Sequence, residues 1–281
     1  MRLQVTHHLT YRYSEPVALA PQQILLRPRE NHHVSVVRFR LAVEPESRLC
    51  WTHDHHENSV AWAYFRDRTD ELDVRADLEV ETLDRNPFDF VLRSDAVRHP
   101  FHYLPAEAAM LAPCMDEPGG RSHPLLAWLR SVMPQFPEDT LELLTLLNRA
   151  LSEQISFRSQ LEPTVQNPED TIRRRSGTSR DFAVLMMHAC RALGFAARYV
   201  SGYQHEAAHA SGGGLHAWTE VYLPGAGWKG FDAAHALLAD EHFVPVAVGR
   251  GAENLAPVTG AFWGRSGIDS TLKVYVEVRA L

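Results

Sequence analysis

Alternation of apolar and polar residues dominates the first hundred positions of the chain. Its clearest example covers residues 72–80, and shorter runs cover residues 3–11, 37–43 and 60–64. A period of two is the pattern of a β-strand with one face in the core and one in water. Proline, asparagine and aspartate between the runs favour turns. Residues 1–100 are therefore predicted to form an antiparallel β domain.

The pattern changes in the second part of the chain. Residues 84–120 are rich in proline and glycine, which is typical of a connecting region. Helical spacing of apolar residues follows, and alternation then returns. Residues 101–281 are predicted to form a second domain of α+β class, with helices first and strands after. The expected helices cover 125–129, 141–147 and 179–193, and the expected strands cover 196–203, 216–223, 228–232 and 272–278.

Composition narrows the classes of protein to consider. The net charge of −7 disfavours a nucleic-acid partner. No apolar run approaches the ~18 residues of a membrane span, and the first residues lack the apolar stretch of a signal peptide. The three cysteines, Cys50, Cys114 and Cys190, are far apart in sequence. This spacing favours a reducing compartment and gives neither a disulfide framework nor a Cys-x-x-Cys zinc site. A cytoplasmic protein without a membrane partner is expected.

The most informative segment begins the helix predicted at residue 179. Thr178 followed by Asp181 resembles a capping box, which places Ser179 in the first helical turn. A nucleophile there lies at the positive end of the helix dipole, near free backbone N–H groups. Such groups stabilise a thiolate or an oxyanion. A serine near a helix start is nevertheless more often a simple cap, so this segment alone decides nothing.

Two later segments add a histidine and an aspartate. His216 begins one predicted strand, Asp232 ends the next, and a turn at residues 224–227 separates them. The two strands are predicted to pair as a hairpin. Asp232 can then lie beside His216 and orient its ring through one nitrogen.

Four motifs now stand in a characteristic order. In this sequence they occupy residues 177–183, 197–203, 216–220 and 227–232. They resemble the motifs of the bacterial transglutaminase-like family, a branch of the papain-like superfamily of thiol enzymes. In that family the four motifs are, in order, Gly-x-Cys-x-Asp-Phe-Ala, Ala-Arg-Tyr-Val-Ser-Gly-Tyr, His-Ala-Trp-x-Glu and Gly-Trp-x-x-Phe-Asp. Residues 1–80 also look like the N-terminal β region of that family, including its Asp54-to-Asn58 element.

The resemblance implies both a fold and a chemistry. It implies an antiparallel β domain followed by a papain-like, transglutaminase-type core. It also implies an amide-bond hydrolase or acyltransferase that acts on a peptide, a protein or a small amide. The family's roles would make Ser179 the nucleophile, His216 the base and Asp232 its orienting partner. No cofactor is expected, because nothing in the sequence supplies a phosphate loop or a convincing metal shell.

One departure from the family pattern decides how the site is interpreted. Ser179 stands where the family has its catalytic cysteine, and Cys190 lies 190 − 179 = 11 residues further on, about 16 Å along a helix. Three explanations stay open: a cysteine replaced by design, a natural protein that lost catalysis and kept a binding groove, and a true serine enzyme. The family's Asp-Pro-Thr is also Asp232-Ala233-Ala234 here. We therefore expect weak or absent activity, with a catalytically silent peptide- or amide-binding module as the alternative.

Three other features have a simpler explanation beside a functional one. His53, His55 and Glu57 would share one face of a strand and could bind a metal, but a solvated turn is favoured. The triplet at residues 173–175 could attract acidic substrates, although a charge run is usually a solvated face. Residues 205–214 are expected to form a loop, either a lid over the site or plain disorder.

Overall fold

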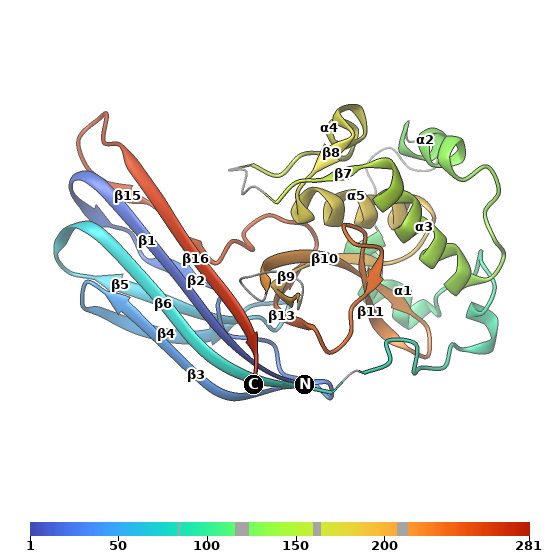
Figure 1. Cartoon of the computed structure of the whole chain (residues 1–281), viewed down its shortest axis with the longest axis horizontal. Helices are drawn as coiled ribbons and strands as arrows, with labels where there is room; N and C mark the ends of the chain where they lie inside the picture. Colours follow the sequence, from blue (N-terminus) through green and yellow to red (C-terminus); the bar gives the residue numbers. More distant parts are fainter. Residues whose placement is uncertain (84, 116–123, 160–163, 207–212) are drawn as a thin grey trace.

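The computed structural model describes residues 1–83, 85–115, 124–159, 164–206 and 213–281 (Figure 1). The described chain combines antiparallel sheets with a group of helices, which confirms the predicted α+β class. In Figure 1 the long strands lie on the left, the helices on the right, and a further sheet between them. No helix in the described ranges has both the length and the hydropathy needed to cross a membrane.

Two antiparallel sheets form the left part of the molecule and enclose one apolar core. The first sheet has the order β15-β1-β6-β3, with β16 also paired to β1, and the second has the order β14-β2-β5-β4. The alternating residues of the sequence, such as Leu3, Val5, Leu72 and Val74, are buried between them. The strand bounds are β1 (Arg2–Leu19), β2 (Gln22–Ile24), β3 (Val34–Glu44), β4 (Ser47–His53), β5 (Ser59–Phe65), β6 (Arg68–Thr82), β14 (Val258–Thr259), β15 (Phe262–Trp263) and β16 (Ser270–Ala280).

The partner of β16 differs from the expectation. The sequence predicts this strand as part of the second domain, but residues 270–280 pair with residues 3–13 of β1. Strands β14 and β15 likewise pair with β2 and β1. Alternation identifies a strand without identifying its neighbour, because a half-buried strand has the same pattern in any sheet. The boundary near residue 100 therefore does not describe how the sheets are assembled.

The right part of the molecule is built around helix α5 (Ser179–Ala192), which packs on β9 (Ala197–His205) and β10 (Gly213–Leu223). These two strands belong to a five-stranded sheet of order β12-β11-β10-β9-β13. The remaining bounds are η1 (Ser94–Ala96), α1 (Pro105–Met115), α2 (Pro124–Val132), α3 (Thr140–Gln154), β7 (Ser156–Phe157), α4 (Pro168–Arg174), β8 (Ser176–Gly177), β11 (Gly227–Asp232), β12 (Leu237–Leu238) and β13 (Phe243–Gly249).

Helix α1 lies inside the segment that its prolines and glycines assign to a connection. Pro105 is the first residue of the helix, where a missing N–H costs nothing, and Pro113 comes near its end. The two prolines are therefore compatible with a short helix between them.

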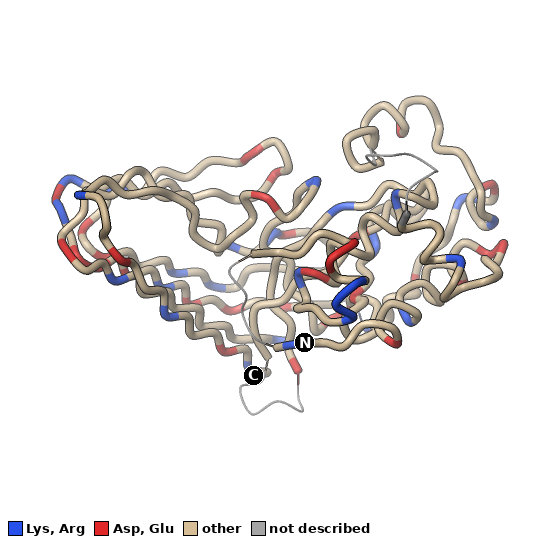
Figure 2. Tube along the Cα trace, turned by 90° about the horizontal axis from the view of Figure 1, so that it is seen from above, with Lys and Arg blue, Asp and Glu red and all other residues tan. Residues whose placement is uncertain are grey.

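Charges of both signs are interspersed along the long strands, as Figure 2 shows, which is the distribution of a solvated surface.

A buried asparagine ties the β sheets to the central sheet. The Asn58 amide donates to the Val248 carbonyl in β13 at 2.7 Å, and its oxygen accepts from the Val248 N–H at 2.8 Å. The same oxygen accepts from Arg29 at 2.8 Å. Asp54 accepts the backbone N–H of Asn58 at 2.9 Å and so closes the turn. Asn58 thus acts as an extra residue in the ladder of β13.

The same turn contains most of residues 53–57, for which the sequence favours a solvated turn. The side chains of His53, His55 and Glu57 are exposed, and Asp54 and Asn58 form the internal hydrogen bonds. The expectation of a solvated turn is confirmed.

Asn58→Ala should lower the free energy of unfolding by about 2–4 kcal/mol, because the buried N–H and C=O of Val248 would both lose their partner. Chemical denaturation followed by circular dichroism measures the change. Asn86→Ala, at an exposed turn with one backbone bond, is the control and should cost less than about 1 kcal/mol. An unfolding midpoint of Asn58→Ala equal to that of the unchanged protein would show that the two parts do not depend on this contact.

Candidate functional site

The start of helix α5 is fixed by one buried carboxylate. Asp181 Oδ2 accepts the Thr178 N–H at 2.7 Å and the Thr178 hydroxyl at 3.0 Å. Gln166 donates its backbone N–H to Asp181 Oδ1 at 2.7 Å. A Cβ on Gly177 would lie 2.8 Å from the Asp181 Cβ, so only glycine leaves room for this carboxylate. Ser179 therefore becomes the first helical residue, as the capping pattern predicts.

The hairpin predicted for the histidine and the aspartate is present. Strands β10 and β11 pair with Thr219 opposite Phe231. His216 and Asp232 are both buried, and His216 Nε2 lies 3.0 Å from Asp232 Oδ2. The imidazole N–H is not aligned with that oxygen well enough for a hydrogen bond, so the contact is a close electrostatic one.

A glycine next to His216 permits close packing behind it. Gly202 in β9 is paired with His216 across the strands. A Cβ at Gly202 would lie 2.2 Å from the Val244 carbonyl oxygen and 2.7 Å from the Trp218 ring. Strand β9, which pairs with the strand that carries His216, is thereby held close against β13.

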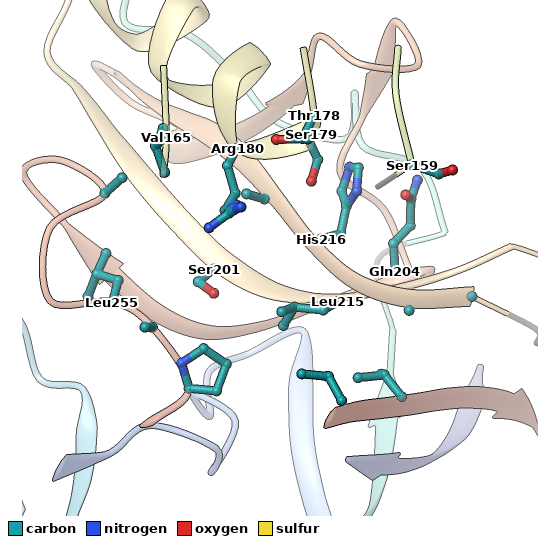
Figure 3. Close-up of a pocket in the computed structure, with 18 of the residues that line it drawn as sticks. Ser159, Val165, Thr178, Ser179, Arg180, Ser201, Gln204, Leu215, His216 and Leu255 are labelled. Carbon is teal, nitrogen blue, oxygen red and sulfur yellow. The ribbon is translucent and has the colours of Figure 1, made fainter. Parts of the chain in front are cut away.

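Ser179 and His216 meet in one cavity. Both residues line a hollow of about 410 Å³ between helix α5, the central sheet and strand β16. Figure 3 shows the Ser179 hydroxyl on the side of the His216 ring. Because Asp232 lies against Nε2, Nδ1 is the nitrogen left for a reacting group. The roles of Ser179, His216 and Asp232 in a reaction remain predictions.

Two further residues contact Asp232, and the sequence does not predict them as part of the site. His235 Nδ1 lies 2.9 Å from Asp232 Oδ2, and Gln204 Nε2 lies 3.5 Å from the same oxygen. The Ala234 N–H donates to Oδ1 at 3.0 Å. The His235 ring lies 5.2 Å from the His216 ring, nearly parallel to it. In the sequence, the signal for this contact is that His235 stands three residues after Asp232.

These contacts determine the charge on Asp232 and on His235. Burial opposes ionisation of Asp232, but the charges of His216 and His235 and the hydrogen bond from His235 outweigh it and hold its pKa below the ordinary value. The hydrogen bond to Asp232 raises the pKa of His235 above its usual 6.5, against the effect of burial. Asp232 is therefore a carboxylate at neutral pH, held between two imidazole rings.

His216, Asp232 and His235 are also a group whose donor atoms could approach one metal ion, since they lie within 4.8 Å of one another. A metal would need the Asp232 oxygen that already accepts the His235 N–H. In the structure this oxygen accepts a hydrogen bond from His235 and lies 3.0 Å from His216 Nε2.

The cysteines of the core lie away from this chemistry. Cys190 is fully buried in helix α5, and burial raises the pKa of its thiol. Burial also raises the pKa of Cys114. Neither residue lines the cavity, so neither supplies a thiolate in place of Ser179.

The remaining predicted features lie at the edge of the site. Arg173, Arg174 and Arg175 are exposed at the end of α4, and Arg173 pairs with Asp170, as expected of a solvated face. Most of the predicted loop, residues 207–212, lies outside the described residues. Gly213 and Gly214 begin strand β10 and line the cavity.

Two family models match the chain. Residues 3–81 match the bacterial transglutaminase-like N-terminal region, and residues 130–233 match the transglutaminase-like superfamily. Residues 130–233 belong to the transglutaminase-like superfamily. The match covers helix α5 and the hairpin that carries His216 and Asp232, so the motifs that carry the resemblance in the sequence lie within it.

Relatives of this transglutaminase-like protein match over its whole length. An uncharacterized protein of Mycobacterium leprae is 26% identical, and the alignment spans 100% of this chain and 99% of that protein. An uncharacterized protein of Mycobacterium tuberculosis is 25% identical, with 99% of this chain matching 92% of that protein. The crystal structure of a candidate cysteine protease from Cytophaga hutchinsonii has a TM-score of 0.73 at 20% identity, over 100% of this chain and 91% of that chain. This structure shows that the whole fold, β sheets included, is shared.

The contact between His235 and Asp232 should make the stability of this transglutaminase-like protein depend on pH. Because the folded-state pKa of His235 is raised, its contribution is complete below the unfolded value of about 6.5 and is lost as pH rises through the folded value. His235→Gln should therefore lower the free energy of unfolding most near pH 5.5 and least near pH 8.5. Urea denaturation across this range measures the difference.

Asp232→Asn removes the hydrogen bond and the larger of the two negative charges that raise the pKa of His235, and leaves Glu206, so it supplies the control for this pH series. In that background the effect of the further change His235→Gln should vary less with pH. A destabilisation by His235→Gln that grows toward alkaline pH would contradict the assignment.

Proposed function

We propose that the cavity is an acyl-transfer site for amides, in which Ser179 holds the position of the nucleophile, His216 that of the base and Asp232 that of its orienting partner. One observation carries the proposal: the hydroxyl at the start of a helix and a histidine backed by a buried carboxylate line the same cavity. The class of substrate is a peptide, a protein segment or a small amide. Hydrolysis and transfer differ only in whether water or an amine takes the acyl group.

The chemistry follows from the roles of the three groups. The Ser179 oxygen would attack the amide carbonyl carbon while His216 Nδ1 takes its proton. The backbone N–H at the start of α5 would stabilise the oxyanion, since first-turn N–H groups have no partner within the helix. His216 would then return the proton to the departing amine, leaving an ester on Ser179. Water or a second amine would complete the reaction.

A serine hydroxyl in place of a thiol makes these reaction steps slow. A site of the cysteine type stores its reactivity as a thiolate beside an imidazolium, and a serine hydroxyl is too weak an acid to form the equivalent pair. The oxyanion donors and the histidine would also have to suit a C–O bond that is shorter than a C–S bond. We therefore propose that generic amides are bound and turned over weakly or not at all.

A binding module without catalysis is the second candidate. It is favoured by Asp232, which is shared between His216 and His235 and is not aligned with the His216 N–H. A base that is not held in one orientation is a poor proton acceptor.

We also propose that the protein is cytoplasmic. This location is supported by the three cysteines, none of which forms a disulfide.

The unchanged protein should release little or no ammonia from glutamine peptides and should incorporate little amine into them. The physical reason is the weak acidity of the Ser179 hydroxyl. Ammonia release and incorporation of a fluorescent amine measure the two reactions. Efficient turnover that disappears in both Ser179→Ala and His216→Ala would instead establish a working serine enzyme.

Ser179→Cys should create a reactive thiol. The helix dipole, the free N–H groups and His216 would lower its pKa well below about 8.5. Alkylation by iodoacetamide at about pH 6, located by peptide mass spectrometry, should be fast at residue 179 and slow at Cys50, Cys114 and Cys190. Adding His216→Ala should slow it sharply. Equal and slow labelling of all four thiols would favour the binding module.

A further inference from the structure

The cavity beside Ser179 has one charged wall and one apolar wall. Figure 3 shows the Arg180 side chain directed into the hollow, on the side of Ser179 away from His216 and above Ser201. Across from it the lining is apolar. These apolar residues come from the central sheet, from the segment before β14 and from β16, and they are Leu215, Leu255, Pro257, Val274 and Val276.

The positive charge of Arg180 acts inside this space. Tyr199 also lines the cavity and is almost completely buried. Burial raises the pKa of its hydroxyl, and the charge of Arg180 opposes that rise. Besides Arg180, the described lining holds two charged residues, Arg158 and Glu206. The Glu206 carboxylate lies 4.0 Å from His235 Nε2. The acidic charge is thus at the His235 end, and Arg180 is at the opposite end.

We propose that the cavity selects amides that carry a carboxylate near the reacting carbonyl, and that Arg180 binds this carboxylate. The inference deepens the proposed function, on which it rests. A guanidinium binds a carboxylate through two parallel hydrogen bonds, and apolar walls that exclude water strengthen the pair. A hollow of about 410 Å³ is large enough for one acidic residue with its neighbouring amide. The position next to Ser179 in sequence keeps the bound charge close to the site of attack.

Two reagents of nearly equal size test the charge directly. Iodoacetate carries the carboxylate and iodoacetamide does not. Both alkylate the thiolate of the Ser179→Cys protein: a bond forms between the sulfur and the CH2 carbon of the reagent, and iodide leaves. Adding Arg180→Gln should slow iodoacetate by about tenfold, equivalent to about 1.4 kcal/mol, and slow iodoacetamide less than about twofold. Adding Arg180→Lys should retain part of the preference, because the charge remains without the planar fork.

The matched control is Arg174→Gln in the same background. Arg174 is an exposed arginine outside the cavity lining, so its loss should leave both rates unchanged. Fast labelling of residue 179 with equal effects of Arg180→Gln on the two reagents would overturn this inference and leave the proposed nucleophile intact. Slow labelling by both reagents would count against the proposed function alone, because the binding measurement below does not need a reactive thiol.

Calorimetry on the unchanged protein tests the carboxylate without any reaction. N-acetyl-aspartate methylamide presents an acidic side chain, N-acetyl-alanine presents a terminal carboxylate, and N-acetyl-alanine methylamide has no charge. We expect one of the two acids to bind at least about tenfold more tightly than the neutral compound, and to lose that advantage in Arg180→Gln. The acid that does so identifies the source of the carboxylate. Equal binding of all three compounds, or an advantage that survives Arg180→Gln, would overturn the inference.

Discussion

A carboxylate with no exposed surface has to be compensated by its neighbours, and the arrangement of the site follows from how Asp232 meets this requirement. Its oxygens face two imidazole rings, a glutamine amide and one backbone N–H. These partners come from β9, β10 and the turn after β11, so the carboxylate can remain ionised only when these neighbouring segments are in register. The pairing of these strands and the ionised state of Asp232 therefore depend on each other.

A second buried carboxylate acts at the other side of the cavity. Asp181 directs the first turn of α5, whereas Asp232 directs the face of His216. The two carboxylates hold the candidate nucleophile and the candidate base on separate elements. Rigid elements position reacting groups better than loops do, because their side chains are fixed by packing. The candidate nucleophile is a serine, where the resemblance in sequence implies a cysteine.

The sequence is informative wherever a local pattern has one structural solution. Alternation identifies β1 and β6, and Thr178 with Asp181 identifies the start of α5. The short turn at residues 224–227 implies the hairpin that brings His216 to Asp232. The contact of His235 with Asp232 is not accessible in the same way, because it depends on the path of the chain after β11. The alternation at residues 272–278 likewise predicts a strand but carries no information about β1 as its partner.

Strand β16 has a consequence for how the protein matures. Its residues Val274 and Val276 form one wall of the cavity, and the strand is held there by pairing residues 270–280 with residues 3–13. Pairing over such a separation carries a large loop-closure entropy, so it forms after local helices and hairpins. During synthesis on the ribosome, helix α5 and the β10–β11 hairpin emerge before their wall does. The nascent chain thus presents its candidate nucleophile before this wall of the cavity exists, and the cavity is complete only when the final sheet has formed.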